Sequence, residues 1–191
     1  MSDMINIAMI CDENFTCLTK TCIKSIIANK KNNTRYHFYI IGVEISKQTI
    51  QEFQNLEQTN VVITILVKNN DYENIGQPKH RVSKAALFKF QLPNLISADK
   101  VLYLDGDIVA SDDLGELYHT DISENYAAMA VDWVAEIRKE DHIRLLHRHY
   151  FNSGVILLNL KKMREDGIAE KLLAYKEHDT FNRYMDQDAF N

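Results

Sequence analysis

The acidic segment in Lys100-Val-Leu-Tyr-Leu-Asp-Gly-Asp-Ile-Val109 follows an apolar run and carries the strongest chemical signal in the sequence. Residues two apart on an extended chain face the same way, so Asp105 and Asp107 can point at one ion. Gly106 between them lets a ligand approach the backbone closely. Carboxylate oxygens suit Mg²⁺ or Mn²⁺, which bridge protein carboxylates to substrate phosphates. Since Asp and Gly are also ordinary turn residues, a solvated turn is the alternative interpretation of these residues alone.

Three other segments place polar side chains beside apolar runs. Ile10-Cys-Asp-Glu-Asn14 closes the first run, and the small polar groups of Phe151-Asn-Ser-Gly-Val155 come just ahead of a late one. Tyr184-Met-Asp-Gln-Asp-Ala-Phe-Asn191 holds an acid-amide-acid run that leads into a candidate helix. Ligands of parallel α/β sheets bind beyond the carboxyl ends of the strands, so the first segment is a natural position for a nucleotide.

Short apolar runs alternate with helical patterns along the chain, and these elements must position the polar segments. We expect strands at Ile5–Cys11, Tyr36–Gly42, Val61–Val67, Val101–Leu104, Ala127–Val131 and Val155–Asn159. We expect helices at Leu18–Asn29, from the N-cap Ser46 to Gln58, at Val82–Phe90, and at Lys161–Glu177 with a break at Asp166-Gly167. The alternation predicts an α/β fold with a mainly parallel sheet flanked by helices. Without a linker or a repeat, residues 1–191 are expected to form a single domain.

The composition limits the classes of partner. The chain has 191 residues, 46% of them hydrophobic, and a formal net charge of −5. An acidic balance argues against nucleic acid, whose phosphate backbone needs a basic face. A small phosphorylated ligand is compatible with it, because a metal ion supplies positive charge locally.

The cysteines and the apolar runs indicate a compartment. Cys11, Cys17 and Cys22 form no Cys-x-x-Cys pair, so they predict neither a disulfide framework nor a zinc site. We find no secretory signal and no stretch of ~20 apolar residues that would span a bilayer. A soluble protein in a reducing cytoplasm is the expectation.

Taken together and in this order, the segments resemble the family 8 glycosyltransferases, retaining enzymes with a single GT-A domain. They resemble in particular the bacterial lipopolysaccharide galactosyl- and glucosyltransferases. The resemblance covers residues 7–15, 99–117, 130–133, 151–164 and 186–191, of which 99–117 and 151–162 are the most specific. It implies a Rossmann-like, mixed but mainly parallel sheet. It also implies metal-dependent transfer of galactose or glucose from a UDP-sugar to a saccharide, glycolipid or lipopolysaccharide-type acceptor.

The resemblance assigns the metal and the nucleotide. Asp105 and Asp107 look like the metal-binding pair for Mn²⁺ or Mg²⁺, with Asp107 also near the ribose-phosphate. The positions similar to those that hold uracil and ribose are Ile10, Asp12 and Asn14. Lys89 stands where the family usually has an Arg that touches the donor sugar and diphosphate. This is a departure, because Lys offers a point charge instead of a planar fork.

The resemblance also assigns the sugar pocket. Asp132 matches a position that binds donor-sugar hydroxyls, and Asn152 and Ser153 match the pair that lines the pocket. Asp186 and Gln187 match the residues beneath the anomeric carbon. A neutral amide is a poor nucleophile, so we favour front-face attack with Gln187 as electrostatic support, and Asp186 is the alternative nucleophile.

One family feature is missing from these 191 residues. The family usually continues to a His-x-x-Gly-x-x-Lys-Pro-Trp motif, whose His is a third protein ligand to the metal, and no such motif occurs here. The expectation is a domain that lacks the family's C-terminal segment. Peripheral contact with the inner face of the cell membrane is expected only through that segment.

Two other functions remain as alternatives. Without the motif, the chain can be a non-catalytic nucleotide-sugar-binding module. The acidic segment also resembles the first motif of haloacid-dehalogenase-type phosphatases, which is expected on an early strand and leaves Asp12, 151–155 and 186–188 unexplained. Trp133 fits either an acceptor cleft or the core.

Overall fold

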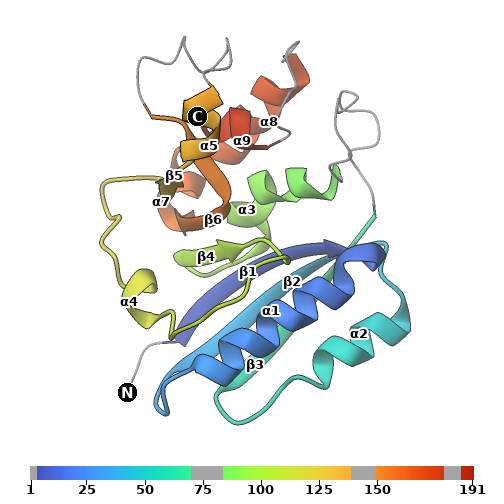
Figure 1. The fold of residues 1–191 in the computed structure, drawn as a ribbon. Coiled ribbons are helices and arrows are strands. Elements are labelled where there is room, and N and C mark those ends of the chain that lie inside the picture. Colours follow the sequence, from blue (N-terminus) through green and yellow to red (C-terminus); the bar gives the residue numbers. More distant parts are fainter. Residues whose placement is uncertain (1–3, 70–83, 139–148, 179–185) are drawn as a thin grey trace.

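A single sheet organises the chain in the computed structural model, which describes residues 4–69, 84–138, 149–178 and 186–191. Its six strands lie in the order β3-β2-β1-β4-β6-β5 (Figure 1). The strands are β1 Met4–Asp12, β2 Arg35–Val43, β3 Val61–Lys68, β4 Lys100–Leu104, β5 Ala127–Val131 and β6 Phe151–Asn159. The first four are parallel, and β6 runs antiparallel between β4 and β5. The predicted α/β fold with a mainly parallel mixed sheet is therefore confirmed.

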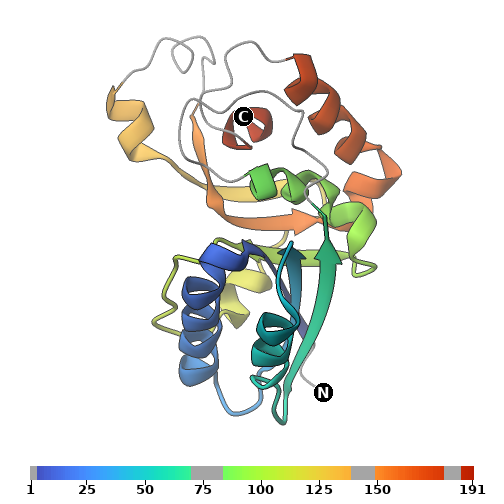
Figure 2. The ribbon, with the colours of Figure 1, turned by 90° about the vertical axis from the view of Figure 1, so that its right-hand side faces the viewer.

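Helices cover both faces of this sheet. They are η1 Glu13–Phe15, α1 Thr16–Asn29, α2 Lys47–Gln54, η2 Lys84–Gln91, α3 Leu92–Leu95, α4 Gly115–Tyr118, α5 Trp133–Arg138, α7 Leu160–Glu165, α8 Ile168–His178 and α9 Gln187–Phe190. Figure 2 shows α1 and α2 on the same face of the lower half of the sheet, while η2, α3 and α7 lie by the upper half. No helix of the described ranges is long and apolar enough to cross a membrane.

Alternate residues of β1 enter two separate hydrophobic cores. Ile7 and Met9 pack in the core that includes Ile23 of α1, whereas Ala8 and Ile10 pack in the core that includes residues of η2, α3 and α7. Strands that are buried on both faces read as continuous apolar runs, which is why the sequence located them.

Three elements differ from their predicted form. Helix α2 ends at Gln54 instead of Gln58, and the chain then reverses, with Gln58 paired to Val61 and Asn60 at a positive φ of 71°. The helix expected at 82–90 is a 3-10 helix over the described residues 84–91, followed by α3 with Pro93 in its first turn. Pro93 has no N–H to continue an α-helix from Lys89.

Strand β6 begins earlier than expected. It starts at Phe151 rather than Val155, so the polar residues 152–154 belong to the strand itself. The predicted break in the late helix is confirmed, and Gly167 has a φ of 61° there. The loop expected at 69–79 lies mostly outside the described residues, as do Val82 and Tyr184.

Candidate functional site

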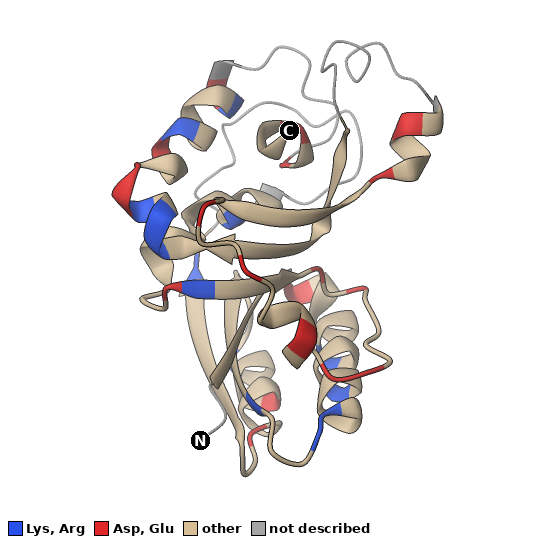
Figure 3. Ribbon diagram, turned by 90° about the vertical axis from the view of Figure 1, so that its left-hand side faces the viewer, with Lys and Arg blue, Asp and Glu red and all other residues tan. Residues whose placement is uncertain are grey.

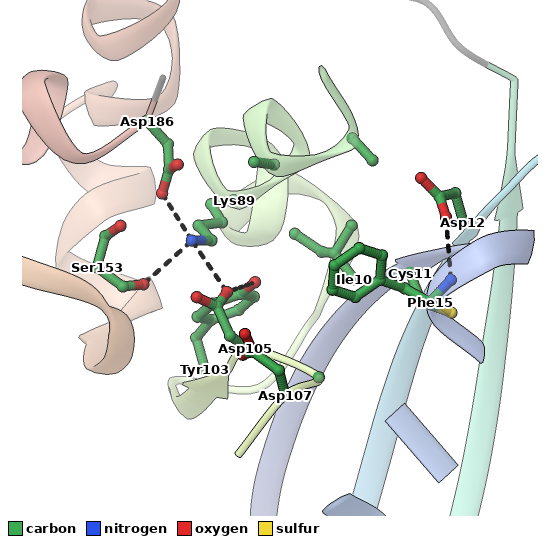
Figure 4. Close-up of a pocket in the computed structure, with 13 residues that line it drawn as sticks. Ile10, Cys11, Asp12, Phe15, Lys89, Tyr103, Asp105, Asp107, Ser153 and Asp186 are labelled. Atoms are coloured by element: carbon green, nitrogen blue, oxygen red, sulfur yellow. Dashed lines mark hydrogen bonds and ion pairs between the residues drawn. The ribbon is translucent and has the colours of Figure 1, made fainter. Parts of the chain in front are cut away.

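The carboxyl ends of β1 and β4 meet because these strands are parallel neighbours, with Ala8 opposite Tyr103. A cavity of about 260 Å³ opens at this edge (Figure 4). It is lined by Ile10, Cys11, Asp12, Phe15, Ala85, Ala86, Lys89, Tyr103, Asp105, Gly106, Asp107, Ser153 and Asp186. Eight of these are site residues expected from the sequence, drawn from β1, η2, the residues just after β4, β6 and Asp186 just before α9. The fold therefore brings together residues up to 176 positions apart in the chain, from Ile10 to Asp186.

Asp105 is held from two sides. The Tyr103 hydroxyl donates to its Oδ1 at 2.7 Å, and Lys89 Nζ lies 3.2 Å from the same oxygen. On the other side, Asp105 N–H donates to the Gly154 carbonyl at 2.8 Å. A Cβ atom on Gly154 would lie only 2.9 Å from Asp105 Oδ2. The glycine therefore makes room for the carboxylate.

Asp107 lines the cavity and directly follows Gly106, a second glycine in close contact with a neighbouring residue. A Cβ atom on Gly106 would lie 2.5 Å from Thr19 Oγ1, so glycine lets the acidic segment pass against α1. Asp107 itself is exposed. Figure 3 shows several acidic residues between β4 and α4, and the sequence has no Lys or Arg from 105 to 115. The acidic segment itself therefore offers no positive side chain to an anionic ligand.

The donor chemistry of the pair fits a divalent cation. Asp105 and Asp107 offer carboxylate oxygens to one cavity, as Mg²⁺ and Mn²⁺ require. Within the described part of the chain, no group of three or more His, Cys, Asp or Glu side chains is arranged to hold a metal. Asp105 and Asp107 would supply two carboxylates, and phosphate oxygens and water would complete the shell.

Lys89 is a buried cation rather than a surface charge. Only 2% of the residue is exposed, and its Nζ lies 2.7 Å from Asp186 Oδ2 and 3.1 Å from the Ser153 carbonyl oxygen, to which it donates. It also lies 4.6 Å from the centre of the Tyr103 ring. Burial alone would lower the pKa of Lys89, but the carboxylates of Asp186 and Asp105 outweigh burial and raise it. Lys89 therefore stays charged and joins η2, β4, β6 and Asp186.

Gln187 belongs to a network beside the cavity. Its Nε2 donates to Asp132 Oδ2 at 3.1 Å, and its Oε1 accepts a hydrogen bond from Ser153 N–H at 3.1 Å. Burial tends to raise the pKa of Asp132, but hydrogen bonds from the Ala135 N–H and the Gln187 side chain lower it overall. Asp132 thus remains a carboxylate whose orientation is fixed.

Four expected site residues do not line the cavity. Asn152 is exposed, and its Oδ1 accepts a hydrogen bond from Gly154 N–H at 2.8 Å. Asn14 is exposed and is part of η1. Gln187 is hydrogen-bonded to the cavity residue Ser153, and Asp132 is hydrogen-bonded to Gln187. The structure connects these residues to the cavity wall without placing them in it.

Asp12 has a structural role that the sequence did not predict. Its Oδ1 accepts hydrogen bonds from Asn14 N–H at 3.0 Å and Phe15 N–H at 3.2 Å, which caps η1. This 3-10 turn leads directly into α1 at Thr16 and leaves Phe15, which is 43% exposed, at the cavity.

Sequence reasoning missed the cavity residues Cys11, Phe15, Ala85, Ala86 and Tyr103, and the close approach of Gly154. One of them had a signal, since Tyr103 lies two residues before Asp105 and so shares its face of β4. Trp133, for which two positions were open, is 64% exposed and is not a core residue.

The sheet and its ligand edge define a GT-A glycosyltransferase fold. Two structures of the galactosyltransferase LgtC match it closely. An active-site mutant superposes with a TM-score of 0.88 and 26% identity, and the complex with donor and acceptor sugar analogs with a TM-score of 0.84 and 28% identity. Each match covers 98% of this chain and 69% of the LgtC chain.

The family follows from the sequence match. The model of glycosyl transferase family 8 matches residues 6–191, so the chain belongs to this family. A lipopolysaccharide 1,2-glucosyltransferase of Escherichia coli (strain K12) is 33% identical over 199 residues, which cover 100% of this chain and 58% of that protein. Glycosyltransferase GlyE of Streptococcus pneumoniae is 26% identical over 166 residues, or 84% of this chain and 37% of that protein. The chain thus spans about three-fifths of the length of the first curated relatives it matches, at 59% and 58%.

Proposed function

We propose that the chain binds a UDP-hexose through Mn²⁺ or Mg²⁺ at Asp105 and Asp107 and transfers galactose or glucose to a saccharide or lipopolysaccharide-type acceptor. The observation that supports this most is the pair of strand-end carboxylates inside a cavity with two different ends (Figure 4). One end is formed by Ile10, Asp12 and Phe15, and the other by Lys89, Ser153 and Asp186.

The two ends suit the two ends of the donor. Ile10 and the exposed Phe15 ring offer apolar surface to a flat base, and Asp12 offers a carboxylate oxygen to a ribose hydroxyl. The acids and carbonyl at the other end accept hydrogen bonds from sugar hydroxyls. The diphosphate would lie between them, beside the acidic pair.

Breaking the bond from the anomeric carbon to phosphate develops negative charge on the leaving diphosphate. A bound divalent cation supplies Lewis-acid stabilisation of that charge. The Lys89 ammonium is fixed beside the cavity and adds a preorganised positive charge that needs no reorientation during reaction. These residues favour departure of the diphosphate over simple binding.

Retention of configuration is proposed to proceed by front-face attack. The acceptor hydroxyl then bonds to the anomeric carbon on the face that the diphosphate leaves, and the leaving phosphate oxygen takes the hydroxyl proton. Gln187 is a neutral amide with both ends hydrogen-bonded, which suits orientation of Asp132 rather than nucleophilic attack. Asp186 is paired with Lys89, and that pairing reduces its nucleophilicity.

The alternatives differ in what they predict. A haloacid-dehalogenase-type phosphatase is not favoured, because the acidic segment follows the fourth strand of the chain, in a family 8 domain. A non-catalytic module would use the same cavity to bind the donor but would release no UDP.

Calorimetry and turnover separate these functions. UDP is titrated with and without Mn²⁺, and UDP release is then measured from UDP-galactose and UDP-glucose. We expect Mn²⁺-dependent binding and slow Mn²⁺-dependent UDP release. Equal UDP affinity in EDTA would refute the metal site, and binding without release would favour the module.

A matched pair of variants assigns the effect to the site. Asp107→Asn should lower Mn²⁺-dependent UDP release by about ten- to a hundredfold or more, while the fold survives. Asp112→Asn is the control, since Asp112 is an exposed acid on the same segment that does not line the cavity. Equal behaviour of the two variants would contradict the assignment.

A further inference from the structure

Tyr103 is a buried tyrosine whose hydroxyl ends at the acidic pair. The residue is 2% exposed and lies on β4, two positions before Asp105, so both side chains emerge from the same face of the strand. The hydroxyl donates to Asp105 Oδ1 at 2.7 Å, and Lys89 Nζ lies above the ring and 3.2 Å from the same oxygen (Figure 4). One carboxylate oxygen thus receives two donors.

The other oxygen of Asp105 has different surroundings. Among the residues that the structure describes, Oδ2 receives no hydrogen bond, and it occupies the space that a Cβ atom on Gly154 would need. A partial rotation of the carboxylate would break both the tyrosine and the lysine contacts, and a half-turn would only exchange two equivalent oxygens. Asp105 is therefore held in one orientation with one oxygen left for a ligand.

We propose that Tyr103 is a positioning residue that makes Asp105 a one-oxygen ligand to the divalent cation. This inference rests on the proposed function, because it requires a cation at Asp105 and Asp107. A carboxylate that offers a single oxygen suits the compact octahedral shells of Mg²⁺ and Mn²⁺, whereas bidentate carboxylates suit Ca²⁺. Groups that orient a ligand typically change metal affinity by about 10–100-fold.

The test uses two tyrosine variants that each remove one buried hydroxyl and keep the ring. Tyr103→Phe removes the contact to Asp105. Tyr36→Phe is the matched control, because Tyr36 is fully buried and its hydroxyl donates to Asp113 Oδ2 at 3.2 Å, at the amino-terminal end of β2. Mn²⁺ binding is measured in the presence of UDP from the loss of the free Mn²⁺ electron paramagnetic resonance signal, and Mg²⁺ and Ca²⁺ are then added as competitors.

We expect Tyr103→Phe to weaken Mn²⁺ binding by about tenfold or more. We also expect it to raise the affinity for Ca²⁺ relative to Mg²⁺, which a purely structural role would not do. Tyr36→Phe should leave Mn²⁺ affinity and the Ca²⁺ to Mg²⁺ ratio unchanged. Unchanged Mn²⁺ affinity and selectivity in a folded Tyr103→Phe protein would overturn the inference while the proposed function stood. Absence of Mn²⁺ binding in the unmodified chain would refute both.

A second variant tests the same carboxylate from its other side. Gly154→Ala places a Cβ atom 2.9 Å from Asp105 Oδ2 unless the carboxylate moves, and it leaves the Tyr103 hydroxyl in place. Circular dichroism shows which variants fold. If Tyr103→Phe does not fold, Gly154→Ala tests the proposal in its place. We expect Gly154→Ala to weaken Mn²⁺ binding severalfold. Wild-type Mn²⁺ affinity in this variant would show that the orientation of Asp105 does not control the site.

Discussion

Two partly buried aspartates, Asp105 and Asp113, each accept a hydrogen bond from a buried tyrosine, yet their surroundings differ. Asp113 Oδ2 accepts from Lys31 N–H at 2.8 Å, Thr34 Oγ1 at 2.6 Å and Tyr36 OH at 3.2 Å, and its Oδ1 accepts from Gly115 N–H at 2.8 Å. Asp105 is held through Oδ1 alone in the described structure, and 40% of its side chain is exposed to the cavity.

We infer that the difference separates a carboxylate that serves stability from one that is proposed to bind a ligand. Hydrogen-bonded groups on both oxygens leave Asp113 little capacity for an ion, and its partners join the α1–β2 connection to the segment before α4. Asp105 is oriented as firmly on one side but keeps an oxygen at a cavity. Buried polar groups are normally satisfied, so an oriented carboxylate with a free oxygen in a cavity indicates binding.

The largest effect on stability is expected from substitution of Lys89, whose ammonium contacts Asp105 Oδ1. Lys89→Met would leave Asp186, only 5% exposed, without its cation, and loss of one partner of a buried pair costs about 3–5 kcal/mol. We expect a large decrease in the free energy of unfolding, measured by urea denaturation. A decrease below about 1 kcal/mol would show that the Lys89–Asp186 pair is solvated. The contacts of Lys89, including the one to Asp105, would then contribute little to stability.

Lys89 also tests donor binding. Lys89→Ala should weaken binding of a UDP-sugar more than Lys89→Arg does, because arginine keeps the positive charge at a position where the family usually has Arg. Calorimetry with Mn²⁺ present measures both, on protein shown to be folded. Dissociation constants unchanged by both substitutions would mean that the Lys89 charge does not act on the donor.

A smaller effect, on binding rather than folding, is expected at Asp105. Asp105→Asn should weaken Mn²⁺-dependent UDP binding by about 10–100-fold. Asp113→Asn should leave UDP binding unchanged and lower the free energy of unfolding by about 1–3 kcal/mol, because an amide NH₂ would face donors. Calorimetry and urea denaturation on both variants give a two-by-two comparison. If Asp113→Asn weakened UDP binding as much as Asp105→Asn, the distinction between the two carboxylates would be wrong.

The strands that carry this comparison, and the acidic pair beside one of them, could be predicted from the sequence. Strands β1 and β4 are buried on both faces, so their apolar runs stand out, and Asp105 and Asp107 follow one of them. The contacts that define the two roles were not readable. Lys89 meets Asp186 and Ser153 only in the folded chain, where η2 brings its side chain to both.

Other details depend on local geometry that residue types do not reveal. Asp12 caps η1 because the chain turns immediately after β1, although the residue type is equally suited to a ribose contact. Gly154 is needed because Asp105 lies against it across the β4–β6 pair, which no pattern within either segment indicates.

The smallest expected effect is the pH dependence that Asp113 gives to stability. Burial tends to raise the pKa of Asp113, but the hydrogen bonds from Thr34, Lys31, Gly115 and Tyr36 outweigh it and lower the pKa below its ordinary value. A carboxyl group whose pKa is lowered by folding stabilises the folded state above its ordinary pKa of about 3.9, and that contribution is lost as the pH falls through the lowered value. The difference in unfolding free energy between wild type and Asp113→Asn should therefore be largest near neutral pH. It should shrink below about pH 4, where the wild-type carboxyl becomes protonated in the unfolded state and then in the folded one. Urea denaturation at a series of pH values measures this. A difference that stayed constant down to the acid limit would mean that the hydrogen bonds to Asp113 stabilise the acid and the carboxylate equally. The contrast with Asp105 would then rest on ligand access alone and not on charge.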